Sequence, residues 1–120
     1  MELRLRPAMS AVYLKLAEVG WRSSSSENET RDFLKDLSRE ERLRLRCWEV
    51  GLFIYGENSF YQYQQGFYDK EFYDYDLLPY VKSRGKLWLA LELARDTGMS
   101  NWVEMVKAEC QHDESERRGK

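Results

Sequence analysis

Histidine is nearly absent from this chain of 120 residues, since the single histidine, His112, lies close to the C-terminal end. Residues 111–120 have mixed charge and no apolar period, so we expect a disordered tail there. Catalysis that pairs histidine with serine or cysteine needs a histidine held in place by the fold. We therefore predict that the chain is not an enzyme.

Cysteine is also scarce, and Cys47 and Cys110 lie far apart without zinc-ligand or CxxC spacing. Neither a zinc site nor a disulfide framework is indicated, and both thiols are expected to be reduced.

Four carboxylates gather later in the chain, at Asp69, Glu71, Asp74 and Asp76. Their spacing does not fit a calcium loop, and the glycine that such a loop needs at its sharp turn is missing. We expect no metal and no cofactor.

Long apolar runs are absent as well. No stretch approaches the roughly 18 consecutive apolar residues of a membrane span, and the first residues lack the apolar core of a signal peptide. A net charge of −2 with 33% charged residues gives no overall attraction to nucleic acid or anionic lipid. This composition favours a cytoplasmic protein and argues against nucleic acid as the partner.

The chain contains only two prolines, Pro7 and Pro79, so long helices can form between them. Apolar residues at helical spacing over 7–19 predict a first helix that ends at Gly20. Residues 22–29 are polar and read as a flexible loop, after which Thr30 caps a short helix. We predict one all-α domain over 1–110, a small bundle of about four to six helices.

One long central helix is predicted from Arg39 to about Gln65, because Ser38 to Glu41 matches a capping box and no proline follows. Gly66 is expected to end it in a left-handed conformation, and Asp69 to cap the next helix. We expect the buried stripe of the long helix to contain Leu43, Cys47, Val50, Ile54 and Tyr61. Gly51 and Gly56 should mark a local bend or, as we prefer, the close approach of another helix.

Helix starts and ends are less clearly marked in the second half of the sequence. Pro79 predicts a kink or restart near residues 75–78, and Ser83-Arg84-Gly85 a break before a helix over 86–95. Gly98 should end that helix, and Ser100 should cap the last one.

Aromatic residues concentrate at the expected helical hairpin that follows the long helix. Such a cluster either packs into the hydrophobic core or forms a partly hydrated interface. A tyrosine suits both, because its ring is apolar while its hydroxyl needs a hydrogen-bond partner or water. The expected interaction surface contains Tyr61, Tyr63, Phe67, Tyr68, Phe72, Tyr73 and Tyr75.

Polar residues also occur among apolar ones on the long helix, namely Glu49, Glu57, Asn58 and Gln62. Buried polar groups need partners, so these four either fix helix register or form a small ligand pocket. Arg39, Arg42 and Arg46 share one helical face. They pair with the acidic segment 69–76, contact an acidic protein partner, or, as the least favoured alternative, bind the phosphates of a nucleic acid.

A family resemblance rests on Glu57-Asn58, on the run from Tyr61 to Phe67, on Asp69 and on Phe72, with Lys86-Leu87-Trp88 following. This pattern resembles a segment of uncharacterised bacterial helical proteins. The resemblance implies an all-helical domain, often found behind an N-terminal membrane helix, with no catalytic residues to carry over. The chain is then either a free cytosolic relative or one whose anchor lies outside it, with 7–19 nearest the membrane.

We hypothesise a non-catalytic protein–protein interaction or scaffolding module, with a protein partner or a second copy as a homodimer. The alternative is a small-ligand sensor or minor enzyme with a pocket between the long helix and the Tyr-rich segment.

Overall fold

The computed structural model describes residues 2–22, 24–93 and 100–118. Its longer helices are α1 (Glu2–Glu18), α2 (Glu27–Leu34), α3 (Arg39–Gln64), α5 (Leu78–Ala90) and α6 (Ser100–Arg118). The short helix α4 (Lys70–Phe72) and the π-helical turn η1 (Tyr73–Leu77) connect α3 to α5. These ranges contain no β-strand, so the predicted all-α class is confirmed.

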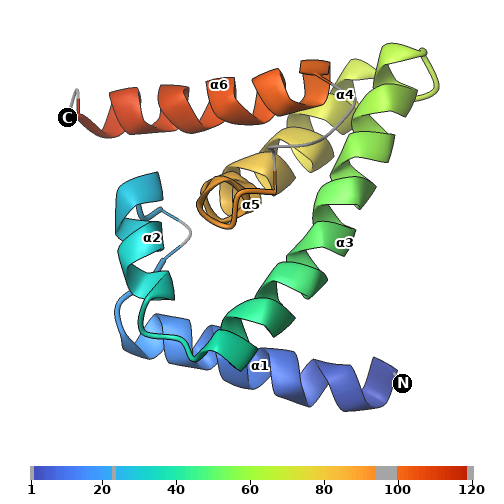
Figure 1. Ribbon diagram of the computed structural model, residues 1–120. Coiled ribbons are helices and arrows are strands. Elements are labelled where there is room, and N and C mark those ends of the chain that lie inside the picture. The colour runs from blue at the N-terminus through green and yellow to red at the C-terminus, as the bar shows by residue number, and fades with distance from the viewer. Residues whose placement is uncertain (1, 23, 94–99, 119–120) are drawn as a thin grey trace.

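Helix α3 runs diagonally through the molecule, from α1 at one end to α4 at the other (Figure 1). Helix α5 packs against α2, α3 and α6, and α1 packs against α3. The longest helix, α3, therefore crosses the molecule diagonally, whereas the shorter α5 makes the more extensive contacts with its neighbours.

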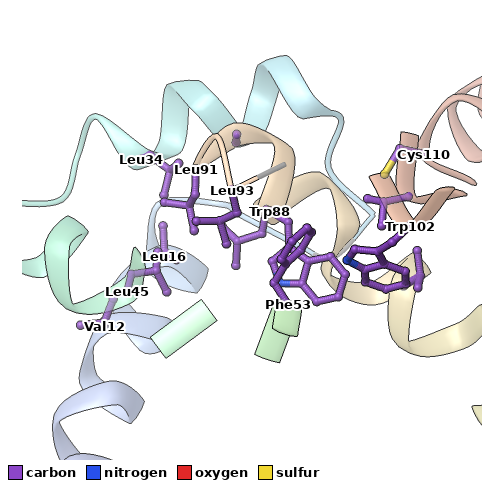
Figure 2. Close-up of a cluster of buried hydrophobic side chains, with 14 of the residues drawn as sticks. Val12, Leu16, Leu34, Leu45, Phe53, Trp88, Leu91, Leu93, Trp102 and Cys110 are labelled. Atoms are coloured by element: carbon purple, nitrogen blue, oxygen red, sulfur yellow. The ribbon is translucent and has the colours of Figure 1, made fainter. Parts of the chain in front are cut away.

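Aromatic rings fill the core where α3, α5 and α6 meet (Figure 2). Phe53 meets Trp88 edge to face at 5.3 Å between ring centroids, and Trp102 lies 5.6 Å from Phe53 and 5.8 Å from Trp88. Both tryptophans are fully buried. Leu16 of α1 and Leu45 of α3 extend the core toward the N-terminal end.

Side-chain caps fix where two helices begin. Ser38 and Glu41 form the capping box predicted for α3. Helix α2 has its own capping box, formed by Ser26 and Glu29, so it begins at Glu27 rather than at Thr30. The helix therefore starts inside the stretch that we expected to be a loop over 22–29.

Two glycines allow α6 to approach its neighbours. A Cβ at Gly56 would lie 2.7 Å from the Trp102 ring, and one at Gly85 would lie 2.7 Å from the Cys110 sulfur. The expected close approach is therefore correct for Gly56 but wrong for Gly51, where nothing lies within 4 Å. Gly85 was expected to break a helix, but it lies inside α5 because α6 packs directly on it.

The predicted buried stripe of α3 was wrong at four of its five residues, whereas Val50 is half-buried and packs against the core. Leu43, Ile54 and Tyr61 are 60%, 48% and 49% exposed, and Cys47 is exposed as well. The buried face instead contains Leu45, Glu49, Phe53, Gly56, Ser59 and Phe60. Helix α3 carries apolar side chains on two faces, and only contacts with α1, α5 and α6 decide which face enters the core.

The ends of the last two helices also differ from expectation. Helix α5 ends at Ala90, and Glu92 follows with a left-handed φ of 62°. Gly98 lies outside the described residues. Residues 111–118 continue α6, where the sequence predicts a disordered tail, because glutamate and arginine are good helix formers. Residues 119–120 of that tail lie outside the described residues.

Candidate functional site

Glu49 is the only one of the four predicted polar residues of α3 that the structure buries, and its exposed fraction is 0%. It lies on the face of α3 that meets α1 and α5, next to Phe53. A buried carboxylate without partners would cost several kcal/mol, so its hydrogen bonds decide whether this site is stable.

Three side chains from two other helices donate hydrogen bonds to Glu49. Arg84 Nη1 lies 2.7 Å from Oε2 and 3.0 Å from Oε1, and Trp88 Nε1 lies 3.0 Å from Oε1. The Tyr13 hydroxyl donates to Oε2. The carboxylate therefore joins α1, α3 and α5 at one point. This geometry suits the predicted role of Glu49 in helix register, which stays a prediction.

Two members of this cluster, Tyr13 and Arg84, have a pKa that is raised further above neutral pH. Burial, together with the negative charge of Glu49, raises the pKa of Tyr13 above its usual value. Burial lowers the pKa of Arg84, but the charge of Glu49 and the Tyr13 hydroxyl outweigh this and hold it above the usual value. Tyr13 stays protonated and Arg84 stays charged, so both act as fixed donors.

A cavity of about 220 Å³ adjoins the cluster between α1 and α5, lined by Tyr13, Trp21, Ser83, Arg84 and Leu87. It differs in place from the pocket that we expected between α3 and the Tyr-rich segment. Ligand pockets usually measure about 300 to 1,000 Å³, so this one is small.

The other polar residues predicted on α3 face outward. Glu57 is half-buried, while Asn58 and Gln62 are exposed. None of their side chains has a hydrogen bond to the Tyr-rich segment among the described residues. They share α3 with Glu49 but not its environment.

Gly66 makes the turn that follows α3. Its φ is +84°, and its N–H donates to the Tyr63 carbonyl while the Phe67 N–H donates to the Gln62 carbonyl. This is a Schellman ending, which favours glycine. Asp69 then caps α4 by accepting a hydrogen bond from the Phe72 N–H at 3.0 Å. Both predictions about this turn are confirmed.

The seven predicted surface aromatics lie on the residues around this turn, from 61 to 75, and we call them the aromatic corner. Tyr63 stacks on Tyr73 at 4.7 Å and Tyr68 on Phe72 at 4.1 Å between centroids. Tyr63, Phe72 and Tyr73 also pack against the core. Burial is the main cause that raises the pKa of Tyr73.

The remaining rings of the aromatic corner are on the surface. Phe67 is 76% exposed and Tyr75 is 78% exposed, whereas Tyr61 and Tyr68 are partly covered. Glu71, Asp74 and Asp76 are exposed beside them and form no ion pair with a described side chain. This end of the molecule is both aromatic and acidic.

A second surface feature lies at the opposite end of α3. A groove of about 900 Å³ runs between α2, the first turns of α3 and the end of α5. Five of its lining side chains are basic and two are acidic, so we call it the basic groove: Arg31, Lys35, Arg39, Arg42 and Arg46 against Asp32 and Glu92.

The structure contradicts one reading of the α3 arginines. They cannot pair with residues 69–76 of the same chain, because that segment follows the far end of a helix of 26 residues. At 1.5 Å per residue, the two ends of α3 are about 39 Å apart. Arg39, Arg42 and Arg46 form no ion pair with any side chain in the described ranges.

No group of three or more potential metal ligands gathers in the described part of the chain. Among the same residues, no helix has both the length and the apolarity needed to cross a membrane.

Comparison with protein-family models, with curated proteins and with solved structures finds no match to this chain. The resemblance to bacterial helical proteins therefore stays a prediction, and the function has to be argued from the molecule itself.

Proposed function

We propose that this chain is a non-catalytic protein–protein interaction module whose contact surface is the aromatic corner. The observation that carries the proposal is the exposure of Phe67 and Tyr75, at 76% and 78%. Exposed apolar side chains that cluster and are rimmed by charge are typical of protein interaction sites, and aromatic residues are enriched there.

The corner is also well ordered for binding. Gly66 and the Asp69 cap fix the backbone, and two stacked ring pairs hold the neighbouring side chains. A preformed surface loses less conformational entropy when a partner binds, so more of the contact energy contributes to affinity.

The Glu49 cluster, in contrast to the aromatic corner, has a structural role in this proposal. Its carboxylate already accepts four hydrogen bonds from Tyr13, Arg84 and Trp88, which uses the acceptor capacity of both oxygens. The cluster therefore holds the scaffold on which the corner is displayed.

The second candidate function is a small-ligand sensor at the cavity beside Arg84. The guanidinium of Arg84 at its wall binds Glu49 through Nη1 and has further N–H donors, which favour a small carboxylate or phosphate. A thermal-shift screen with such anions tests it, because a bound ligand raises the melting temperature by mass action. An unchanged melting temperature at millimolar anion would remove this candidate.

We also propose a cytoplasmic location, with the cytoplasmic face of the membrane as the alternative. Cys47 is a free and exposed thiol, which suits a reducing compartment.

Site-specific photo-crosslinking tests the proposed function. A photoreactive phenylalanine analogue replaces Phe67 or Tyr75 in the native host, and replaces Leu14 as the control. Leu14 is 63% exposed and belongs to α1, which lies at the opposite end of α3 from α4 (Figure 1). We expect a discrete crosslinked product from positions 67 and 75 and none from position 14. Equal labelling at all three positions, or none, would contradict the proposal.

A further inference from the structure

The basic groove has an unbalanced charge that a partner can neutralise. Asp32 Oδ1 lies 3.3 Å from Lys35 Nζ, and Glu92 Oε1 lies 3.9 Å from Arg31 Nη1. The two acidic side chains of the groove therefore form ion pairs with two of its five basic side chains. Arg39, Arg42 and Arg46 follow one another at helical spacing along the edge formed by α3. Like charges within one Debye length, about 8 Å at physiological salt, repel each other.

The groove also offers apolar surface. Leu34, Ala90 and Leu91 line it as nearly buried residues, and Leu43 lines it with 60% of its surface exposed. A complementary ligand therefore combines carboxylates for the arginines with an apolar group that covers these side chains.

The aromatic corner has this chemistry. Glu71, Asp74 and Asp76 supply carboxylates without ion-pair partners among the described residues, and Phe67 and Tyr75 supply exposed rings. Acidic and aromatic groups alternate within ten residues of chain, so one surface presents both. Arginine pairs with carboxylates and also stacks on aromatic faces.

Corner and groove cannot meet within one molecule. They lie at opposite ends of α3, which is one continuous helix from Arg39 to Gln64. Contact between them therefore requires two copies of the chain.

We propose that the protein associates head to tail with a second copy of itself, with the aromatic corner of one copy bound in the basic groove of the next. This inference rests on the proposed function, because it names the partner of the aromatic corner. The contact is heterologous: each copy keeps one free corner and one free groove unless the assembly closes into a ring. Exposed ion pairs are individually weak, so association depends on concentration and on salt.

Sedimentation velocity of the purified full chain tests this inference. We expect the weight-average mass to rise with protein concentration at about 0.01 M salt and to fall toward the monomer at about 1 M, where the Debye lengths are about 30 Å and 3 Å.

Two charge-reversed proteins identify the contact. The groove variant carries Arg42→Glu and Arg46→Glu, and the corner variant carries Asp74→Lys and Asp76→Lys. Each should be monomeric where the unaltered chain associates. Their mixture should form a one-to-one complex, because the groove variant keeps an intact corner and the corner variant an intact groove.

Arg44→Glu serves as the matched control. Arg44 belongs to the same turns of α3, but it pairs with Glu40 at 2.6 Å and does not line the groove. This variant should associate as the unaltered chain does. Circular dichroism verifies that every variant is folded.

A mass that stays monomeric at every concentration and salt would overturn self-association. Association of either double variant like the unaltered chain would overturn it too, as would a mixture that forms no complex. If the chain is monomeric and its groove binds poly-glutamate or a single-stranded oligonucleotide, the groove takes another anion and the inference is also wrong. Crosslinks from position 67 to a different protein would then leave the proposed function standing.

Discussion

The centre and the end of α3 handle polar and aromatic groups in opposite ways. At Glu49 a charged side chain is fully buried, and four hydrogen bonds from α1 and α5 compensate it. At the corner after Gly66, large rings and carboxylates remain in solvent although the core lies close by. A buried carboxylate whose hydrogen bonds are all made stabilises one arrangement of the helices. Exposed and ordered rings, by contrast, can still bury apolar surface when a partner binds. The Glu49 site therefore belongs to the structural scaffold, and the aromatic corner to the proposed contact surface.

The largest expected effect is at the centre. Glu49→Ala leaves Arg84, Trp88 and Tyr13 without their shared acceptor, and removing one partner of a buried pair typically costs about 3 to 5 kcal/mol. Denaturant unfolding measures this change. Glu57→Ala is the control on the same helix, since Glu57 is only half-buried, and it should change stability by less than about 0.5 kcal/mol. Similar losses in both variants would mean that Glu49 is not special.

A smaller effect separates two glycines of α3. Gly56→Ala should destabilise by about 1 to 3 kcal/mol, because the added Cβ meets the buried ring of Trp102. Gly51→Ala adds its Cβ to open space and should stabilise by about 0.5 to 1 kcal/mol through helix propensity. Thermal unfolding of the two variants should therefore move in opposite directions. Shifts of the same sign would contradict the packing of α6.

The next largest effect on stability is expected at Gly66, in the turn between α3 and the aromatic corner. Gly66→Val should cost more than about 1 kcal/mol, since a β-branched residue is strained at a φ of +84°. Gly66→Asn should cost less, because asparagine tolerates the left-handed region. Equal stability of the two variants in urea would show that the turn is not held in this conformation.

The smallest expected effect on stability is at the corner. Replacing Phe67 and Tyr75 together with serine should change the free energy of unfolding by less than about 0.5 kcal/mol, as both side chains are mostly in solvent. Chemical denaturation measures it. A large loss of stability would place the two rings in the core rather than on a contact surface.

The sequence predicts the boundaries of α3 because its signals are local. The Ser38 capping box, the Gly66 ending and the Asp69 cap each depend on residues within a few positions. The start of α2 was missed even though Ser26 and Glu29 form the same kind of capping box, because the serine-rich run around them reads as a loop.

The orientation of α3 could not be predicted in the same way. Leu43 and Ile54 on one face are as apolar as Leu45 and Phe53 on the other, so the pattern alone does not choose between them. Glu49 was recognised as a polar residue among apolar ones, but its partners Tyr13 and Arg84 are more than 30 positions away in the sequence. Such contacts depend on how the helices pack.

The most direct test of the distinction between scaffold and contact surface combines the photo-crosslinker at position 75 with Phe67→Ser. The account predicts that the yield of crosslinked product falls at least about tenfold, the equivalent of about 1.4 kcal/mol of binding energy. Circular dichroism and unfolding should stay as in the parent. An unchanged yield would show that Phe67 makes no contact with the partner and would contradict the assignment of the aromatic corner as the binding surface.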